Sequence, residues 1–246
     1  MFNLIKYELR KTMNIKGIFL VLLALSEIVY LIGLYGDNDE TLAMGMMILM
    51  LVAFAGIITI GIHSIKLLSN DLNTKQSYML FMTPNSSYKI LGAKMIENTL
   101  SLLIAGAVII VIAMVDLTAL VTKYGELTDV VSFFNMFLDD TMQINAPAAI
   151  TSFLAALVNW IYIVTVAFFA VVISATFLNG RKFNGLISFL IFIVVNTVVG
   201  HVVNAIVDEG LNITPEYNLT LIVIYLILSG VMYAITAWIM DHWLSV

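Results

Sequence analysis

Long apolar runs separated by short polar segments dominate the pattern along this chain. A helix needs about 20 mostly apolar residues to cross the ~30 Å hydrocarbon core of a bilayer, because each residue adds about 1.5 Å. Six runs meet this requirement. The predicted spans cover residues 17–35, 42–63, 95–115, 148–178, 185–207 and 219–240.

The fourth run exceeds the length of one perpendicular crossing, so we expect this helix to tilt or to project into water. Pro147 fits its first turn, where a missing N–H group costs nothing.

Composition supports the same interpretation. Hydrophobic residues make up 61% of the 246 residues and charged residues 11%, against roughly 45–50% and 25% in soluble domains. With no internal repeat, we expect one all-α transmembrane domain over residues 1–246. The first apolar run is too long for a cleaved signal peptide, so it is predicted to be the first span.

Basic residues predict the orientation, since Lys and Arg are retained in cytoplasmic loops. Ten of the eleven precede the first span or lie between spans two and three or four and five, whereas Lys123 lies on the other side. Both termini are therefore predicted to be cytoplasmic. The outer side is acidic, and residues 116–147 there are expected to include a short helix that either rests on the outer interface or caps the outer ends of the spans.

The N-terminal residues show a helical pattern of their own. Apolar side chains recur there opposite polar ones, which predicts an amphipathic helix in the inner membrane interface. The apolar positions are Phe2, Ile5, Leu9 and Met13.

Motifs for catalysis are absent from the sequence. No G-x-x-x-x-G-K-[ST] stretch would hold ATP, and the three histidines, in different segments, lack metal-ligand spacing. The chain contains no cysteine. We therefore expect no enzyme activity, metal or cofactor in this chain, and no nucleic-acid partner.

The cytoplasmic segment 69–94, SNDLNTKQSYMLFMTPNSSYKILGAK, contains the most informative motif. It resembles the D-L…Y-L-x-F-x-L-P-x-S-x-x-K-L-L-x-x-K stretch of ABC-2 type transporter permeases from Gram-positive bacteria. Thr83 stands where leucine is usual. The motif covers about a tenth of the chain, and the six-span layout extends the similarity over nearly all of it.

The resemblance implies a permease subunit of an exporter in the bacterial cytoplasmic membrane. It would pair with a second permease copy or a related chain and with two ATP-binding subunits, which hold ATP and Mg. In that family a coupling helix between spans two and three docks on the ATP-binding subunit.

The residues of this segment agree with a docking role. Pro84 interrupts a preceding helix, and Ser86 is a candidate N-cap of the next one. Aromatic and aliphatic side chains before Pro84 would form an apolar anchor; the alternative is that they rest on the lipid interface. The coupling residues are predicted to be Asp71, Tyr78, Leu80, Phe81, Pro84, Ser86 and Lys89.

Polar residues inside the spans form a second candidate site, because burying them in lipid requires a partner or a purpose. Glu27 lies near the middle of the first span, and a stripe at four-residue steps follows the fifth. These residues are expected to line a translocation path or a subunit interface, or to form ordinary interhelical hydrogen bonds. They are Glu27, Asn159, Asn196, Gly200, His201 and Asn204.

Two other functions stay open on the sequence. One is a stand-alone immunity or sensor protein that binds a peptide at the outer face. The other is an intramembrane hydrolase that uses Glu27 and His201, although nothing in their spacing selects that arrangement.

Overall fold

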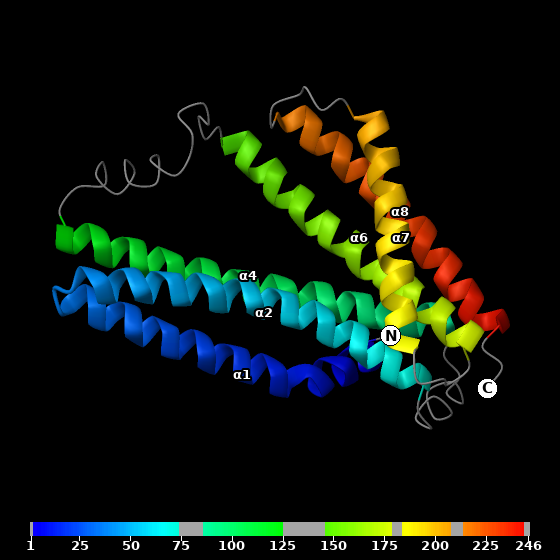
Figure 1. Ribbon diagram of the computed structural model, residues 1–246, viewed down its shortest axis with the longest axis horizontal. Helices are drawn as coiled ribbons and strands as arrows, with labels where there is room; N and C mark the ends of the chain where they lie inside the picture. The colour runs from blue at the N-terminus through cyan, green and yellow to red at the C-terminus, as the bar shows by residue number, and fades with distance from the viewer. Residues whose placement is uncertain (1, 74–85, 125–145, 179–183, 208–213, 244–246) are drawn as a thin grey trace. The chain divides into compact units, whose positions relative to one another are not determined.

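A computed structural model describes residues 2–73, 86–124, 146–178, 184–207 and 214–243 (Figure 1). Within these ranges the protein is all-helical and contains no strand. The helices are α1 (Phe2–Tyr35), α2 (Asp39–Asn73), α4 (Ser87–Tyr124), α6 (Ala146–Leu178), α7 (Asn184–Ile206) and α8 (Pro215–Trp243).

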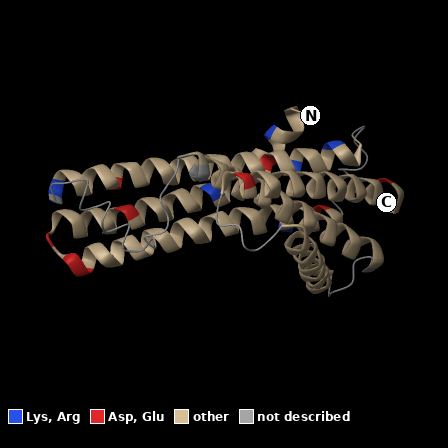
Figure 2. Ribbon diagram, turned by 90° about the horizontal axis from the view of Figure 1, so that it is seen from above, with Lys and Arg blue, Asp and Glu red and all other residues tan. Residues whose placement is uncertain are grey.

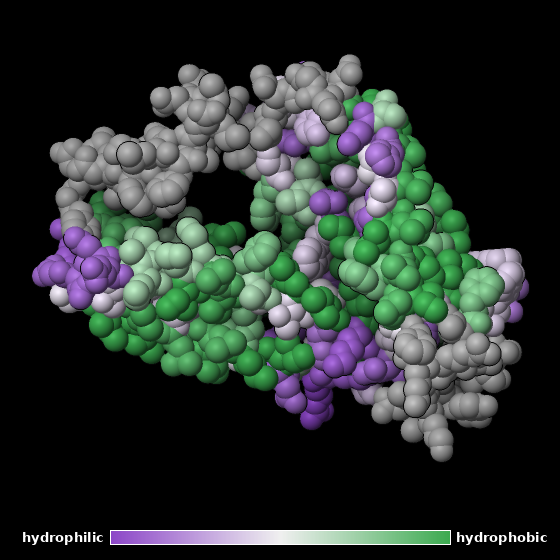
Figure 3. All heavy atoms as spheres, in the orientation of Figure 1, coloured by the Kyte–Doolittle hydropathy of each residue, from purple (hydrophilic) through white to green (hydrophobic). Residues whose placement is uncertain are grey.

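All six of these helices are long and apolar enough to cross a membrane. Charged side chains are sparse along them, with long uncharged stretches between (Figure 2). Large apolar side chains such as Phe54, Phe189 and Ile227 are more than 60% exposed, and hydrophobic residues cover much of the visible surface (Figure 3). Extensive apolar exposure is unusual for a protein in water. The prediction of six long apolar helices is confirmed. Six such helices are consistent with a multi-pass membrane protein.

The helix ends differ from the predicted spans. Residues 2–35 form one continuous helix, so the amphipathic N-terminal segment is not a separate element. Gly17 lies within this helix and costs about 1 kcal/mol, which is too little to break it. No proline interrupts α1 either. Pro147 occupies the first turn of α6, as predicted.

Chain contacts divide the protein into two compact units. The first unit comprises residues 1–8, 62–97 and 144–246, and the second comprises residues 9–61 and 98–143. The helices α1, α2 and α4 each contribute residues to both units.

Two apolar clusters form the interior of the first unit. In one, Leu68 of α2 and Leu91 of α4 pack with Phe168 of α6 and Met240 of α8. In the other, Tyr162 and Val166 of α6 pack with α7 and α8 side chains. The unit therefore holds the ends of α2 and α4 against the bundle of α6, α7 and α8.

Close contacts between α1 and α2 define the second unit. The backbone of Gly33 approaches that of Leu42, and Gly45 lies against Tyr30. A Cβ atom at Gly45 would lie 2.6 Å from the Cα atom of Tyr30. Glycine at these positions lets the two antiparallel helices approach closely, which is a common feature of helix packing in membranes.

Lys123, the one basic residue predicted on the outer side, stabilises the end of α1. Its ammonium group donates a hydrogen bond to the backbone carbonyl of Leu34 and forms an ion pair with Asp37. Asp37 adopts a positive φ of 53° in the turn after α1. A cation near the last carbonyls of a helix is favourable, so Lys123 has a structural role here.

A bulkier residue at Gly45 should disrupt the α1–α2 contact. We expect Gly45→Ala to lower the free energy of unfolding by about 1–3 kcal/mol, because the methyl group meets backbone atoms that cannot move aside. Thermal unfolding in detergent measures this loss.

Gly106→Ala on α4 is the matched control, because nothing lies within 4 Å of a Cβ atom there. It should leave stability unchanged or raise it by up to about 1 kcal/mol. Equal stability of the two variants would contradict the close packing of α1 and α2.

Candidate functional site

The first two turns of α4 belong to the segment 69–94 that contains the permease-like motif. Ser86 is the N-cap residue, and its carbonyl oxygen accepts hydrogen bonds from the N–H groups of Lys89 at 2.9 Å and Ile90 at 3.2 Å. The side chains of Ser86 and Lys89 are exposed. The helix therefore begins where the N-cap pattern predicted it.

The C-terminal helix α8 holds this first turn of α4. The N–H group of Ser87 donates a hydrogen bond to the Asp241 carboxylate at 3.3 Å, and the Tyr233 hydroxyl donates to the carbonyl of Tyr88 at 2.6 Å. The rings of Tyr88 and Tyr233 also meet edge to face. An acidic group at a helix N-terminus is favourable, so α8 fixes the position of this turn.

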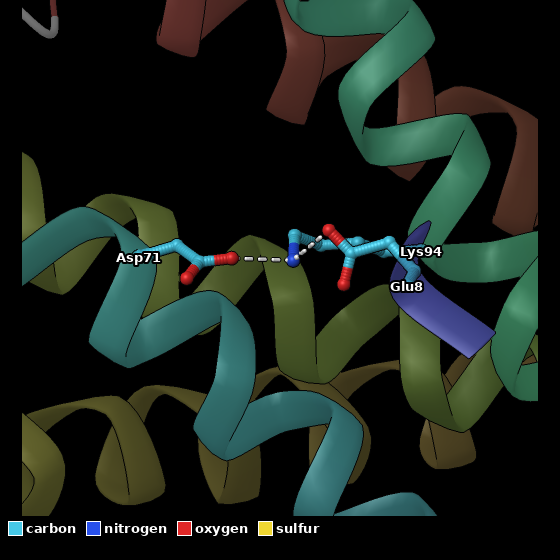
Figure 4. A network of polar contacts seen from close by, with 3 residues as sticks. All are labelled: Glu8, Asp71 and Lys94. Atoms are coloured by element: carbon cyan, nitrogen blue, oxygen red, sulfur yellow. Dashed lines mark hydrogen bonds and ion pairs between the residues drawn. The ribbon is translucent and has the colours of Figure 1, made fainter. Parts of the chain in front are cut away.

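Lys94, two turns into α4, is buried between two carboxylates of the first unit. Its ammonium group lies 2.9 Å from an oxygen of Glu8 on α1 and 2.6 Å from an oxygen of Asp71 on α2 (Figure 4). Lys94 and Glu8 are each 2% exposed, and Asp71 is 4% exposed. We call this arrangement the Lys94 triad.

Burial makes the Lys94 triad sensitive to the loss of any member. Taking charges out of water costs several kcal/mol per ion, and attraction within the protein offsets this only with good geometry. Both contacts of the ammonium are within the range for charge-assisted hydrogen bonds or slightly shorter. The triad thus favours one mutual arrangement of the three helices.

Some predicted coupling residues fall outside the described part of the chain. They are Tyr78, Leu80, Phe81 and Pro84. Asp71 is described and belongs to the triad. Sequence reasoning missed its partners: Lys94 was seen only as part of the motif, and Glu8 was not considered.

In the second unit, Glu27 of α1 interacts with Asp116 of α4. Their carboxyl groups are within hydrogen-bonding reach, and the Tyr30 hydroxyl donates to the backbone carbonyl of Asp116 at 3.4 Å. One oxygen of each carboxyl is buried without a hydrogen bond from a described residue. Asp116 is a further residue that sequence reasoning missed, although it interrupts an apolar run.

The polar stripe of α7 belongs to the first unit. Asn196 donates a hydrogen bond to the carbonyl of Phe192 in its own helix at 2.9 Å. His201 and Asn204, in the last turns of α7, are exposed, and nothing lies within 4 Å of a Cβ atom at Gly200. This face of α7 is therefore not covered by other described helices. That it lines a translocation path or forms a subunit interface stays a prediction.

Asn159, on α6, is half-buried. A different amide on α8, that of Asn218, bridges to α6 by donating to the hydroxyls of Thr151 and Ser152. In the described ranges no three His, Asp or Glu residues gather in a way that could hold a metal ion.

No protein-family model matches this chain, and no curated protein or solved structure shows significant similarity to it. The fold defines the class as an all-helical protein with six candidate membrane-spanning helices.

Removing the shared cation of the triad should destabilise the protein. We expect Lys94→Met to lower the free energy of unfolding by about 3–5 kcal/mol, because two buried carboxylates then face each other without it. Thermal unfolding in detergent measures the loss.

Lys6→Met is the matched control, since Lys6 is an exposed lysine on α1 close to Glu8. It should change stability by no more than about 0.5 kcal/mol. A Lys94→Met variant as stable as Lys6→Met would contradict the buried ion pairs.

Proposed function

We propose that this chain is the membrane-spanning permease subunit of an ATP-driven exporter of the ABC-2 type. The observation that carries the proposal is the permease-like motif of residues 69–94, which begins at the end of α2 and ends in the first turns of α4. Without an ATP-binding motif of its own, the chain takes its energy from a separate ATP-binding subunit that carries ATP and Mg.

The helices on either side of this motif support the proposal. Helix α2 has 35 residues and α4 has 38, about 52–57 Å of helix against a ~30 Å hydrocarbon core. In a bilayer, both helices project well beyond the core at one end or both.

The described ends of this segment form a firm base. Asp71 and Lys94 join α2 to α4 on its two sides, and α8 holds the first turn of α4. Helix ends that are joined in this way transmit a displacement from one helix to the other. ATP-driven closure of the partner would thus move the long helices as stiff bodies.

Orientation and location follow the same proposal. Both termini are cytoplasmic, in a bacterial cytoplasmic membrane, because the basic residues concentrate on that side. The substrate is a peptide, drug or lipid-like molecule that leaves through a path between permease subunits.

Docking through the motif predicts a loss of partner binding when its aromatic residues are removed. We expect Tyr78→Ala with Phe81→Ala to abolish co-purification of a Walker-motif ATP-binding protein, with the chain still inserted. Anchors of this kind contribute about 2 kcal/mol or more each, roughly 30-fold in affinity.

The control is Phe54→Ala, which removes a 68% exposed phenylalanine from α2, away from the motif. It should leave co-purification unchanged. If no ATP-binding protein accompanies the wild-type chain out of the membrane, the proposal of a permease is wrong.

The open face of α7 is proposed to meet a second permease copy. Exposed polar side chains on an apolar helix are costly in lipid and are relieved by a protein partner or by water. We expect His201→Cys, a unique thiol in a chain with no cysteine, to form a disulfide-linked dimer on mild oxidation in membranes.

Val223→Cys provides the matched comparison, since Val223 is a 55% exposed residue on α8. It should remain monomeric on a denaturing gel. Equal cross-linking at both positions would mean random collision, and none at position 201 would exclude a close homodimer at this face.

A further inference from the structure

The Lys94 triad joins three helices that are far apart in the sequence. Glu8 belongs to the beginning of α1, Asp71 to the end of α2 and Lys94 to the beginning of α4. Asp71 and Lys94 both belong to the permease-like motif and stand on the two sides of residues 74–86.

We propose that Lys94 is a positioning residue that links the beginning of α1, the end of α2 and the beginning of α4 into one rigid node. A force on residues 74–86 would then reach all three helices together. The inference rests on the proposed function, because it assigns the triad a role in transmitting the motion of the ATP-binding subunit. Without the ionic contacts, α2 and α4 would still pack through their apolar cluster but could shift relative to each other.

The chemistry of the triad suits this role better than apolar packing does. Apolar side chains slide past one another at little cost, since dispersion contacts are not directional. An ammonium group between two carboxylates has donor geometry that specifies where each partner lies. Buried in the unit, these contacts are also screened little by salt.

The arrangement divides the attachment into two independent arms. The contact with Glu8 attaches α1 to α4, and the contact with Asp71 attaches α2 to α4. Each carboxylate can be removed while Lys94 keeps the other. Glu8→Met and Asp71→Leu therefore serve as controls for each other.

The experiment measures distances between pairs of spin labels by pulsed electron resonance in lipid nanodiscs. The chain has no cysteine, so each introduced cysteine is labelled alone. Tyr7 and Lys66 are exposed on α1 and α2, and Ile96 is exposed on α4. One label pair joins positions 7 and 96, and the other joins positions 66 and 96.

In the wild-type chain both pairs should give narrow distance distributions. In Asp71→Leu the 66/96 distribution should broaden while the 7/96 distribution stays narrow, and Glu8→Met should show the reverse. The double variant Asp71→Lys with Lys94→Asp restores opposite charges and should narrow the 66/96 distribution again. Distributions that stay narrow in both single variants would overturn the proposal.

A second arm uses the complex with the ATP-binding subunit, trapped with Mg-ATP and vanadate. The wild-type 66/96 distance should stay the same on trapping, whereas in Asp71→Leu it should shift. A wild-type distance that shifts on trapping would show that the node is not rigid, and this too would overturn the proposal.

Different results would exclude the permease function and the rigid node. If no ATP-binding subunit associates with the wild-type chain, the proposed function is wrong, but the label distances without nucleotide still test the node. If the subunit associates and the variants keep their narrow distributions, the node is wrong and the permease stands.

Discussion

A charged side chain inside an apolar protein needs a partner, and this constraint fixes the register between α1 and α4. Burying an unpaired ion costs several kcal/mol, so the few charges along these helices limit how they can pair. In the first unit, Glu8 meets Lys94, 86 residues further along the chain. In the second unit, Tyr30 meets Asp116 at the same separation of 86, and Asp37 meets Lys123 likewise. Within each unit, these polar contacts favour one alignment of α1 on α4.

The pairing of α1 with α2 is specified by a different means. Here glycine allows the backbones to touch, as at Gly33 beside Leu42 and Gly45 beside Tyr30. The two residue numbers in each pair have the same sum. A constant sum means that one helix runs forward as the other runs back, as in an antiparallel hairpin. In lipid, apolar side chains gain nothing from leaving water, so close packing takes the place of the hydrophobic effect. Tyr30 serves both pairings, because its backbone faces Gly45 and its hydroxyl reaches α4.

The number and approximate position of the helices were predictable from the sequence, whereas the pairing of charged residues was not. Runs of about 20 apolar residues identify helices directly, and the N-cap pattern around Ser86 located the start of α4. How far a helix extends beyond its apolar run is harder to predict. The first span was predicted to begin at residue 17, but the helix begins at Phe2, because no residue between them breaks it. Glu27 was noticed as a buried carboxyl, but its neighbour Asp116 lies 89 residues away. A single sequence contains no local signal for such a contact.

The position of the Lys94 triad explains why charged residues suit this part of the fold. Next to it, Leu68, Leu91 and Met240 form an apolar cluster with α6 side chains. Such a cluster packs the helices together but specifies their alignment less sharply than an ion pair does, since several apolar arrangements can have similar energies. Ionic contacts add a preferred geometry at little gain in stability. Apolar packing therefore holds the ends of α2 and α4 to the bundle, and the triad determines how they are aligned there. Because Tyr233 and Asp241 also fix the first turn of α4, the beginning of α4 is held both by the triad and by α8.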